Sequence, residues 1–207
     1  MADPIDRNVT EKIKKRYNRN ALLYDSMDKM MRDDWREMTV GKAFGNVLEV
    51  GVGTGFNLAF YQPDKCSKVT AIDFSPAMLK RAKQRAEEAP VPVELLEMDA
   101  QDMTFADDTF DSAISTCVFC SVPFPVEGLK EIRRVTKPGG SIFFLEHMRV
   151  DKPVIGEVMD LLNPVSVKLT GVNINRKTIE NIEKAGMEIV RVENVVGTLL
   201  RFIEARP

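Results

Sequence analysis

Val47-Leu48-Glu49-Val50-Gly51-Val52-Gly53-Thr54-Gly55 is an apolar segment that runs directly into three alternating glycines. Eighteen residues after Gly55, a second apolar segment, 69–72, ends in Asp73. Because glycine has no Cβ, the backbone can turn sharply there and approach a ligand closely. A carboxylate about 20 residues later can sit at the end of the neighbouring strand and accept hydrogen bonds from two ribose hydroxyls. The two segments together predict a site for a nucleoside-bearing cofactor.

The glycine spacing narrows the choice of cofactor. Dinucleotide-binding turns follow G-x-G-x-x-G, whereas this turn is G-x-G-x-G and carries Leu58 three residues after Gly55. No Lys or Arg lies in the turn to meet phosphate oxygens, which argues against a P-loop. The residues therefore suit a cofactor that has a ribose and no phosphate.

Composition sets the class of protein. A chain of 207 residues, 44% hydrophobic with a formal net charge of −2, predicts a single domain, 1–207, and gives no general attraction to nucleic acid. No apolar run reaches the length of a membrane span, and the first seven residues lack the apolar core of a signal peptide. Three cysteines cannot build a disulfide framework, so we expect a cytoplasmic location.

Apolar and amphipathic segments alternate along the chain. Strands are predicted at about 46–50, 68–72, 93–98, 110–116 and 141–146, with helices at about 55–61, 76–88 and 126–136. The tail predicts an irregular or helical stretch at 153–170, a helix at 176–185, and strands at 187–194 and 198–205 joined at Gly197. This order predicts an α/β fold with a mostly parallel sheet and an antiparallel edge strand.

An N-terminal helical cap is predicted over residues 1–38, ahead of a core at 39–207. Ile13, Tyr17, Ala21 and Tyr24 recur at three- to four-residue spacing and form one apolar face. A basic run from Lys12 to Arg19 surrounds that face. It predicts either reversible contact with an anionic membrane surface or only a solvated helix face.

Five segments in order resemble the class I S-adenosylmethionine-dependent methyltransferases, over residues 40–205. They are Glu49-Val50-Gly51-Val52-Gly53-Thr54-Gly55, Asp73-Phe74-Ser75-Pro76-Ala77-Met78-Leu79, Met98-Asp99-Ala100-Gln101-Asp102, Phe110-Asp111, and Arg134-Val135-Thr136-Lys137-Pro138-Gly139-Gly140. The resemblance implies a Rossmann-like, doubly wound, seven-stranded sheet, with S-adenosylmethionine as cofactor and S-adenosylhomocysteine as product. The implied cofactor-binding residues are Glu49, Gly51, Gly53, Thr54, Gly55, Asn57, Asp73, Phe74, Met78, Asp99, Ala100, Thr116, Cys117 and Val118.

Finer resemblances leave the methyl acceptor open. Cys120-Ser121-Val122, Phe144-Leu145-Glu146-His147, Asn163-Pro164 and Gly171-Val172-Asn173 resemble the membrane-associated thiol methyltransferases of animals. Residues 49–73 with Tyr24-Asp25 look equally like bacterial phosphatidylethanolamine N-methyltransferases, and Tyr24-Asp25-Ser26-Met27 resembles quinone C-methyltransferases. We expect transfer to nitrogen or sulfur of a small or lipid-like acceptor. The alternatives are methylation of a quinone ring and a non-catalytic cofactor-binding regulator.

Three residues are candidates for catalysis. His147, the only histidine, follows the fifth strand, where it is either a general base or a structural hydrogen-bonding residue. Tyr17 and Tyr24 either cover the sulfonium and bind substrate or pack the cap on the core.

Two further segments need an interpretation. Cys117 and Cys120 have C-x-x-C spacing, but no second pair accompanies them, so we expect small residues lining the site and no metal. The apolar stretch 153–175 predicts either the substrate-side wall or lid, or a core helix.

Overall fold

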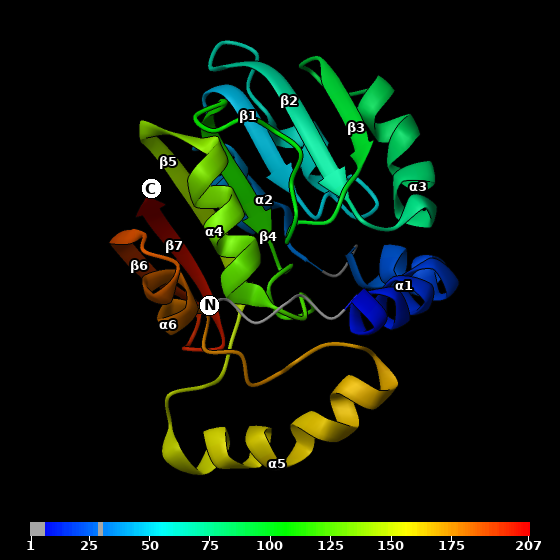
Figure 1. Cartoon of the computed structure of the whole chain (residues 1–207), viewed down its shortest axis with the longest axis vertical. Coiled ribbons are helices and arrows are strands. Elements are labelled where there is room, and N and C mark those ends of the chain that lie inside the picture. Colours follow the sequence, from blue (N-terminus) through cyan, green and yellow to red (C-terminus); the bar gives the residue numbers. More distant parts are fainter. Residues whose placement is uncertain (1–6, 29–30) are drawn as a thin grey trace.

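The computed structural model describes residues 7–28 and 31–207 and shows one seven-stranded sheet (Figure 1). The strand order is β3-β2-β1-β4-β5-β7-β6. The strands are β1 (Gly45–Val50), β2 (Cys66–Asp73), β3 (Val93–Glu97), β4 (Phe110–Thr116), β5 (Thr136–His147), β6 (Glu188–Val196) and β7 (Leu200–Arg206). β7 is antiparallel to both of its neighbours, so the predicted mixed sheet is confirmed.

Helices cover both faces of this sheet. They are α1 (Arg7–Asp28), α2 (Asp33–Val40), the 3-10 helix η1 (Phe56–Phe60), α3 (Pro76–Glu87), α4 (Pro125–Val135), α5 (Pro153–Leu169) and α6 (Thr178–Lys184). One buried core joins the sheet to α4 and α6, and a second joins it to α2, η1 and α3. Two cores on opposite faces are the doubly wound arrangement that the resemblance implies.

Local sequence explains why these elements form. Leu48 and Val50 pack into the first core and Val47 into the second, because successive side chains of a strand point to opposite faces. The side chain of Ser75 accepts a hydrogen bond from the backbone N–H of Met78, and Pro76 occupies the first turn of α3. Both residues are favourable at a helix start.

Several boundaries differ from the prediction. The helix expected at 55–61 is the short 3-10 helix η1, and it begins only at Phe56 because Gly55 before it has a left-handed φ of 88°. β5 begins five residues earlier than predicted, because a register shift between Phe110 and Ser112 accommodates the Pro-Gly-Gly stretch. The cap contains two helices; its residues 1–6, and the side chains of Asp25, Ser26 and Met27, lie outside the described part of the structure.

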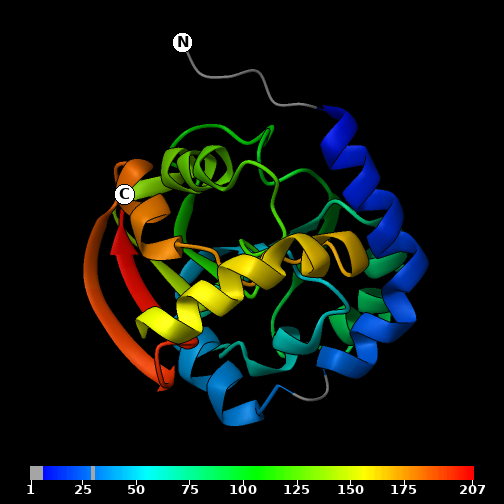
Figure 2. The same cartoon turned by 90° about the horizontal axis from the view of Figure 1, so that it is seen from below.

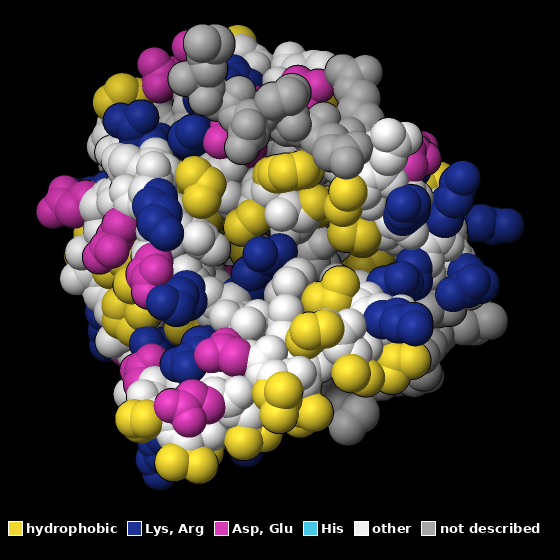
Figure 3. Space-filling model, turned by 60° about the horizontal axis from the view of Figure 1, so that its bottom comes forward, with side chains coloured by type: hydrophobic (Ala, Val, Ile, Leu, Met, Phe, Trp, Pro, Cys, Tyr) yellow, Lys and Arg dark blue, Asp and Glu magenta, His cyan; other side chains and the backbone are white. Residues whose placement is uncertain are grey.

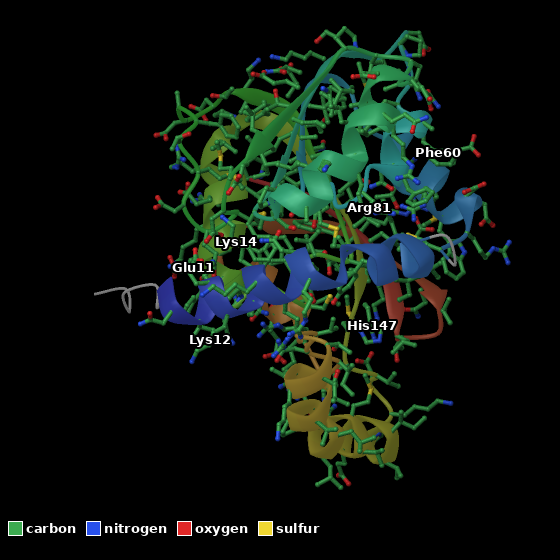
Figure 4. All side chains as sticks on the ribbon, turned by 90° about the vertical axis from the view of Figure 1, so that its right-hand side faces the viewer. Glu11, Lys12, Lys14, Phe60, Arg81 and His147 are labelled. Carbon is green, nitrogen blue, oxygen red and sulfur yellow. The ribbon has the colours of Figure 1, made fainter. Side chains whose placement is uncertain are left out.

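The carboxyl ends of the parallel strands all lie at one end of the sheet, where α1 and α5 are found (Figures 1 and 2). α1 is attached there by the side chain of Asn18, whose Oδ1 accepts a 2.6 Å hydrogen bond from Ser75 Oγ, and by a 2.7 Å ion pair between Lys14 and Glu97. Figure 4 shows α1 running across this end of the core, between the sheet and α5. The cap and α5 therefore enclose the end of the sheet at which ligands bind in open α/β folds.

Candidate active site

A cavity of about 380 Å³ lies at the carboxyl ends of the strands, beneath the cap. Fourteen of the predicted site residues line it: Tyr17, Tyr24, Gly51, Gly53, Asn57, Asp73, Phe74, Met78, Asp99, Ala100, Thr116, Cys117, Val118 and His147. The fold thus brings together residues from six separate stretches of sequence.

The glycine turn forms one wall of this cavity. The N–H groups of Gly51 and Val52 both donate to the carbonyl of Ile72, at 2.8 and 3.0 Å, which ties the turn to the end of β2. Gly51 has a φ of 68°, and a Cβ placed on it would lie 2.4 Å from Cγ2 of Val118. Both the left-handed backbone and the close approach of Val118 therefore require glycine at this position.

Two carboxylates stand at the ends of neighbouring strands. Asp73 Oδ2 accepts from the Gly53 N–H at 3.0 Å and Oδ1 from the Ser75 N–H at 2.8 Å, which sets the orientation of the carboxylate. Asp99 Oδ1 accepts from the Gln101 N–H at 2.9 Å, and Gln101 Nε2 also donates to it at 3.0 Å. Both carboxylates also line the cavity, and carboxylate oxygens are acceptors for ligand hydroxyls and amines.

Three predicted cofactor-binding residues do not line the cavity. Glu49 is buried behind the wall, where it accepts 2.9 Å hydrogen bonds from Asn57 Nδ2 and from the Tyr61 hydroxyl. Thr54 is also buried, and a Cβ on Gly55 would lie 3.1 Å from Ala82 of α3. The Glu49 carboxyl is thus held behind the wall and the end of the turn packs on α3, so direct contact of these three residues with the cofactor stays a prediction.

Arg36 is a site residue that the sequence did not reveal. It is 3% exposed, lines the cavity, and donates to Asn57 Oδ1 at 2.8 Å. Asn57 in turn donates to Thr116 Oγ1 at 3.0 Å, so a positive charge is linked to the end of β4. In the sequence, a buried arginine on a short polar helix looks the same as a solvent-exposed arginine.

Gln101 and Ser121 were also missed as positioning residues. Gln101 orients Asp99 and accepts a 2.8 Å hydrogen bond from the Phe124 N–H. Ser121 Oγ accepts a hydrogen bond from the Tyr17 hydroxyl. Both contacts join segments more than twenty residues apart, so no local sequence pattern predicts them.

The two tyrosines close the cavity from the cap. Their rings stack with centroids 4.5 Å apart, and Tyr17 also meets the ring of Phe74 edge-on at 5.5 Å. The Tyr24 hydroxyl donates to the carbonyl of Thr170 at 3.0 Å, beyond the end of α5. Burial raises the pKa of Tyr17 well above its ordinary value, so this phenol stays protonated. The tyrosines thus form a neutral aromatic wall.

His147 and Glu146 lie side by side at the end of β5 but face different surroundings. Burial lowers the pKa of His147, so the half-buried imidazole is neutral at pH 7. Within residues 7–28 and 31–207, no group forms a hydrogen bond with its Nδ1 atom. Glu146 is fully buried, and its Oε1 accepts from Ser115 Oγ and from the N–H groups of Val118 and Phe119 at 3.0–3.3 Å. Glu146 therefore holds the cavity floor, whereas His147 faces the cavity.

The cysteine pair contributes small side chains to the wall. Both Cys117 and Cys120 line the cavity, as predicted. Cys120 Sγ donates to the carbonyl of Cys117 at 3.3 Å, and burial raises the pKa of its thiol to about 12. In the described part of the chain, no group of three or more His, Cys, Asp or Glu side chains could hold a metal ion.

The apolar stretch 153–175 contributes less to the cavity than expected. Only Val172 and Ile174, which follow α5, line it. The apolar side chains of α5 itself face away from the cavity into solvent, with Leu161 and Leu169 77% and 69% exposed. The predicted substrate-side wall is therefore confined to the loop after α5, and α5 is not a core helix either.

The cavity residues fit the cofactor that the resemblance implies. Asp73, at the end of the strand next to the glycine turn, would hold the ribose hydroxyls, and Asp99 would accept from the adenine amine. The glycine turn and the positive charge of Arg36 would receive the amino-acid end. Phe74, Met78 and Met98 supply apolar surface between these polar groups. Among the described residues that line the cavity, Arg36 is the single arginine or lysine, so the walls do not offer the cluster of basic groups that would bind a pyrophosphate.

Comparison with known proteins agrees with this geometry. A family profile described as a methyltransferase domain matches residues 48–144. The chain is 37% identical to a phosphatidylethanolamine N-methyltransferase from Cereibacter sphaeroides, over 70% of this chain and 73% of the relative. It is 33% identical to a thiol S-methyltransferase from Rattus norvegicus, over 84% and 73%.

Two further comparisons extend the range. A ubiquinone/menaquinone biosynthesis C-methyltransferase from Bdellovibrio bacteriovorus is 29% identical over 84% of this chain and 75% of its own. The fold matches a crystal structure of an S-adenosylmethionine-dependent methyltransferase from Thermotoga maritima, with a TM-score of 0.69 at 19% identity, over 93% of this chain and 99% of that chain. The chain therefore belongs to the class I S-adenosylmethionine-dependent methyltransferases, and S-adenosylmethionine is its cofactor.

Proposed function

We propose that the protein transfers a methyl group to the nitrogen or sulfur of a small or lipid-like acceptor. The observation that carries this proposal is the cavity itself, in which the neutral imidazole of His147 shares a largely apolar space with Tyr17, Tyr24 and Val172. An apolar cavity with few polar groups suits an apolar or amphiphilic acceptor. A neutral imidazole can take the proton that an amine or thiol loses.

Most of the catalytic work is alignment. The cofactor supplies a methyl group that is already activated on a sulfonium, so the protein needs no strong acid. The cavity floor at Thr116–Val118 is fixed by Glu146, and the cap is fixed by Tyr17 and Tyr24. Holding two reactants in line can lower a barrier by roughly 7–11 kcal/mol. The floor and the cap would therefore provide the main rate enhancement by orienting the acceptor and excluding water.

His147 would handle the proton. The neutral imidazole would accept the N–H or S–H proton that the acceptor loses when it is methylated. Protonation of His147 at low pH removes this function. We therefore expect an acidic limb in the pH profile below about pH 6.5, since burial lowers the pKa of His147 from that ordinary value.

A radiolabelled methyl-transfer screen tests the proposal. The acceptors are phosphatidylethanolamine, an alkyl thiol and a demethylated quinone. Product with the amine or the thiol supports the proposal, and His147→Asn should then lower kcat and flatten the acidic limb without changing cofactor affinity. An unchanged profile in that variant returns His147 to a structural role.

Two other outcomes overturn the proposal. Product with the quinone alone establishes carbon methylation, the reaction named for the Bdellovibrio relative. Tight cofactor binding by calorimetry with no product from any acceptor favours a non-catalytic regulator.

A further inference from the structure

The apolar face of α5 points toward solvent, whereas a core helix would bury it. Seven apolar residues at three- to four-residue spacing form a stripe that is exposed to solvent: Val154, Ile155, Val158, Leu161, Leu162, Val165 and Leu169. We call this set the α5 stripe. Exposed apolar patches of this kind mark sites of interaction with a partner or a membrane.

Polar contacts fix the inner face of α5 and so hold the stripe outward. Arg149 makes hydrogen bonds of 2.8–3.1 Å to Asp160, and the amide of Asn163 accepts from the Ile174 N–H at 2.9 Å. Gly156 leaves room for this arrangement, since a Cβ on it would lie 2.4 Å from the Arg149 guanidinium. The outward direction of the α5 stripe is therefore part of the folded structure.

A basic stripe on α1 lies next to the α5 stripe. Lys12, Lys15 and Arg19 are exposed at helical spacing, and Arg16 on the same face donates to the Val167 carbonyl of α5 at 2.6 Å. Figure 3 shows hydrophobic side chains gathered along α5 with Lys and Arg side chains beside them over α1. On α5 itself, Asp160 pairs with Arg149, and Glu157 is an exposed acidic residue in the first half of the helix.

From these two stripes we propose that this face docks on an anionic phospholipid bilayer. The α5 stripe would lie in the membrane plane among the acyl chains, while the α1 lysines and arginines would meet lipid phosphates. No helix in the described ranges is long and apolar enough to cross a membrane. A second copy docked through α5 would bring the basic residues of both copies to one interface, which like charges disfavour.

The docking surface adjoins the part of the cavity wall that the cap and the loop after α5 provide. Tyr24 and Val172 line the cavity, and the Tyr24 hydroxyl reaches the Thr170 carbonyl at the end of α5. An acceptor dissolved in the bilayer would therefore be held close to this wall of the cavity. Only this delivery role rests on the proposed function, because docking itself needs neither cofactor nor methyl transfer.

Vesicle flotation with the full chain tests docking directly. The probes are vesicles of phosphatidylcholine alone and vesicles that also contain phosphatidylglycerol. Leu161→Gln/Leu169→Gln should lower the partition coefficient for the anionic vesicles by at least about tenfold. The matched control is Val190→Gln/Val192→Gln, which replaces exposed apolar residues on β6 and should bind like the wild type.

Substituting two lysines of α1 tests the electrostatic contribution to membrane binding. Lys12→Gln/Lys15→Gln should weaken anionic binding by about 30-fold at two charges near the surface. Lys80→Gln/Lys83→Gln removes the same charge from exposed positions on α3 and should have little effect. Circular dichroism checks that each variant is folded.

The outcomes separate docking from catalysis. Equal vesicle binding by the wild type and Leu161→Gln/Leu169→Gln overturns the inference. So does a dimer in sedimentation velocity that this variant abolishes while no form binds vesicles. A protein that floats with vesicles but methylates nothing leaves docking standing and sinks the proposed function instead.

Discussion

Replacing Glu146 with glutamine should remove a pH dependence of stability that this buried carboxyl imposes on the fold. Its side chain is completely buried behind the cavity floor. Three hydrogen bonds to Oε1 favour the charged form, but burial outweighs them and raises the pKa from an ordinary 4.5 to about 7.

The direction of this pH dependence follows from the pH at which the unfolded and the folded chain each lose the Glu146 proton. Between pH 4.5 and about 7 the unfolded chain has lost the Glu146 proton, whereas the folded chain retains it. The contribution to stability is therefore complete below the unfolded pKa and is lost as pH rises through the folded one. At 1.36 kcal/mol per pKa unit, the loss amounts to about 3 kcal/mol.

Denaturant unfolding at a series of pH values measures this directly. Glu146→Gln keeps an oxygen to accept the three hydrogen bonds and cannot ionise. The free energy of unfolding of the variant, relative to the wild type, should rise by about 3 kcal/mol between about pH 4 and pH 8. A difference that stays constant over this range would refute the assignment of burial as the dominant cause.

Asp111→Asn provides a control of opposite sign. The ammonium of Lys137, 2.7 Å from Oδ1, lowers the pKa of this carboxyl. Its contribution to stability is present above its unfolded pKa and is lost as pH falls, so the variant should be penalised at neutral pH and not in acid.

Three other substitutions test the site. Asp73→Ala should abolish S-adenosylmethionine binding in calorimetry, because the ribose loses its carboxylate; retained micromolar affinity would sink that assignment. Gly51→Ala should cost roughly 1–3 kcal/mol in stability from the left-handed backbone and also weaken cofactor binding through the clash with Val118, whereas Gly139→Ala, at φ 82° with open space around it, should show the strain alone. Tyr17→Phe should destabilise the fold by about 1 kcal/mol in thermal unfolding, since it removes the hydrogen bond to Ser121; no change would mean that the cap is held by ring packing only.

Patterns that are local in the sequence were predicted well. The seven strands and the glycine turn depend on alternation and on residues close together in the chain, so periodicity and spacing reveal them. Asp73 and Asp99 follow directly from strand ends, and the structure places both on the cavity wall.

Contacts between distant segments were not predicted. Arg36 reaches the cavity through Asn57, and Gln101 orients Asp99 while accepting from Phe124. Glu49 belongs to the glycine motif, but its side chain lies behind the cavity wall, where Asn57 and Tyr61 donate hydrogen bonds to it. These assignments depend on which face of the sheet each side chain occupies.

The sequence by itself determined that the chain folds as an α/β domain with an S-adenosylmethionine site, because the glycine turn and the strand-end carboxylates can be recognised from residues close together in the chain. Only the tertiary structure decided what surrounds that site. It turned the apolar residues of α5 outward, because Arg149 and Asn163 satisfy the inner face with polar contacts. It also brought the basic face of α1 beside them through Arg16. Which face of an amphipathic helix is exposed depends on the residues that pack against it, and those residues lie far away in the chain.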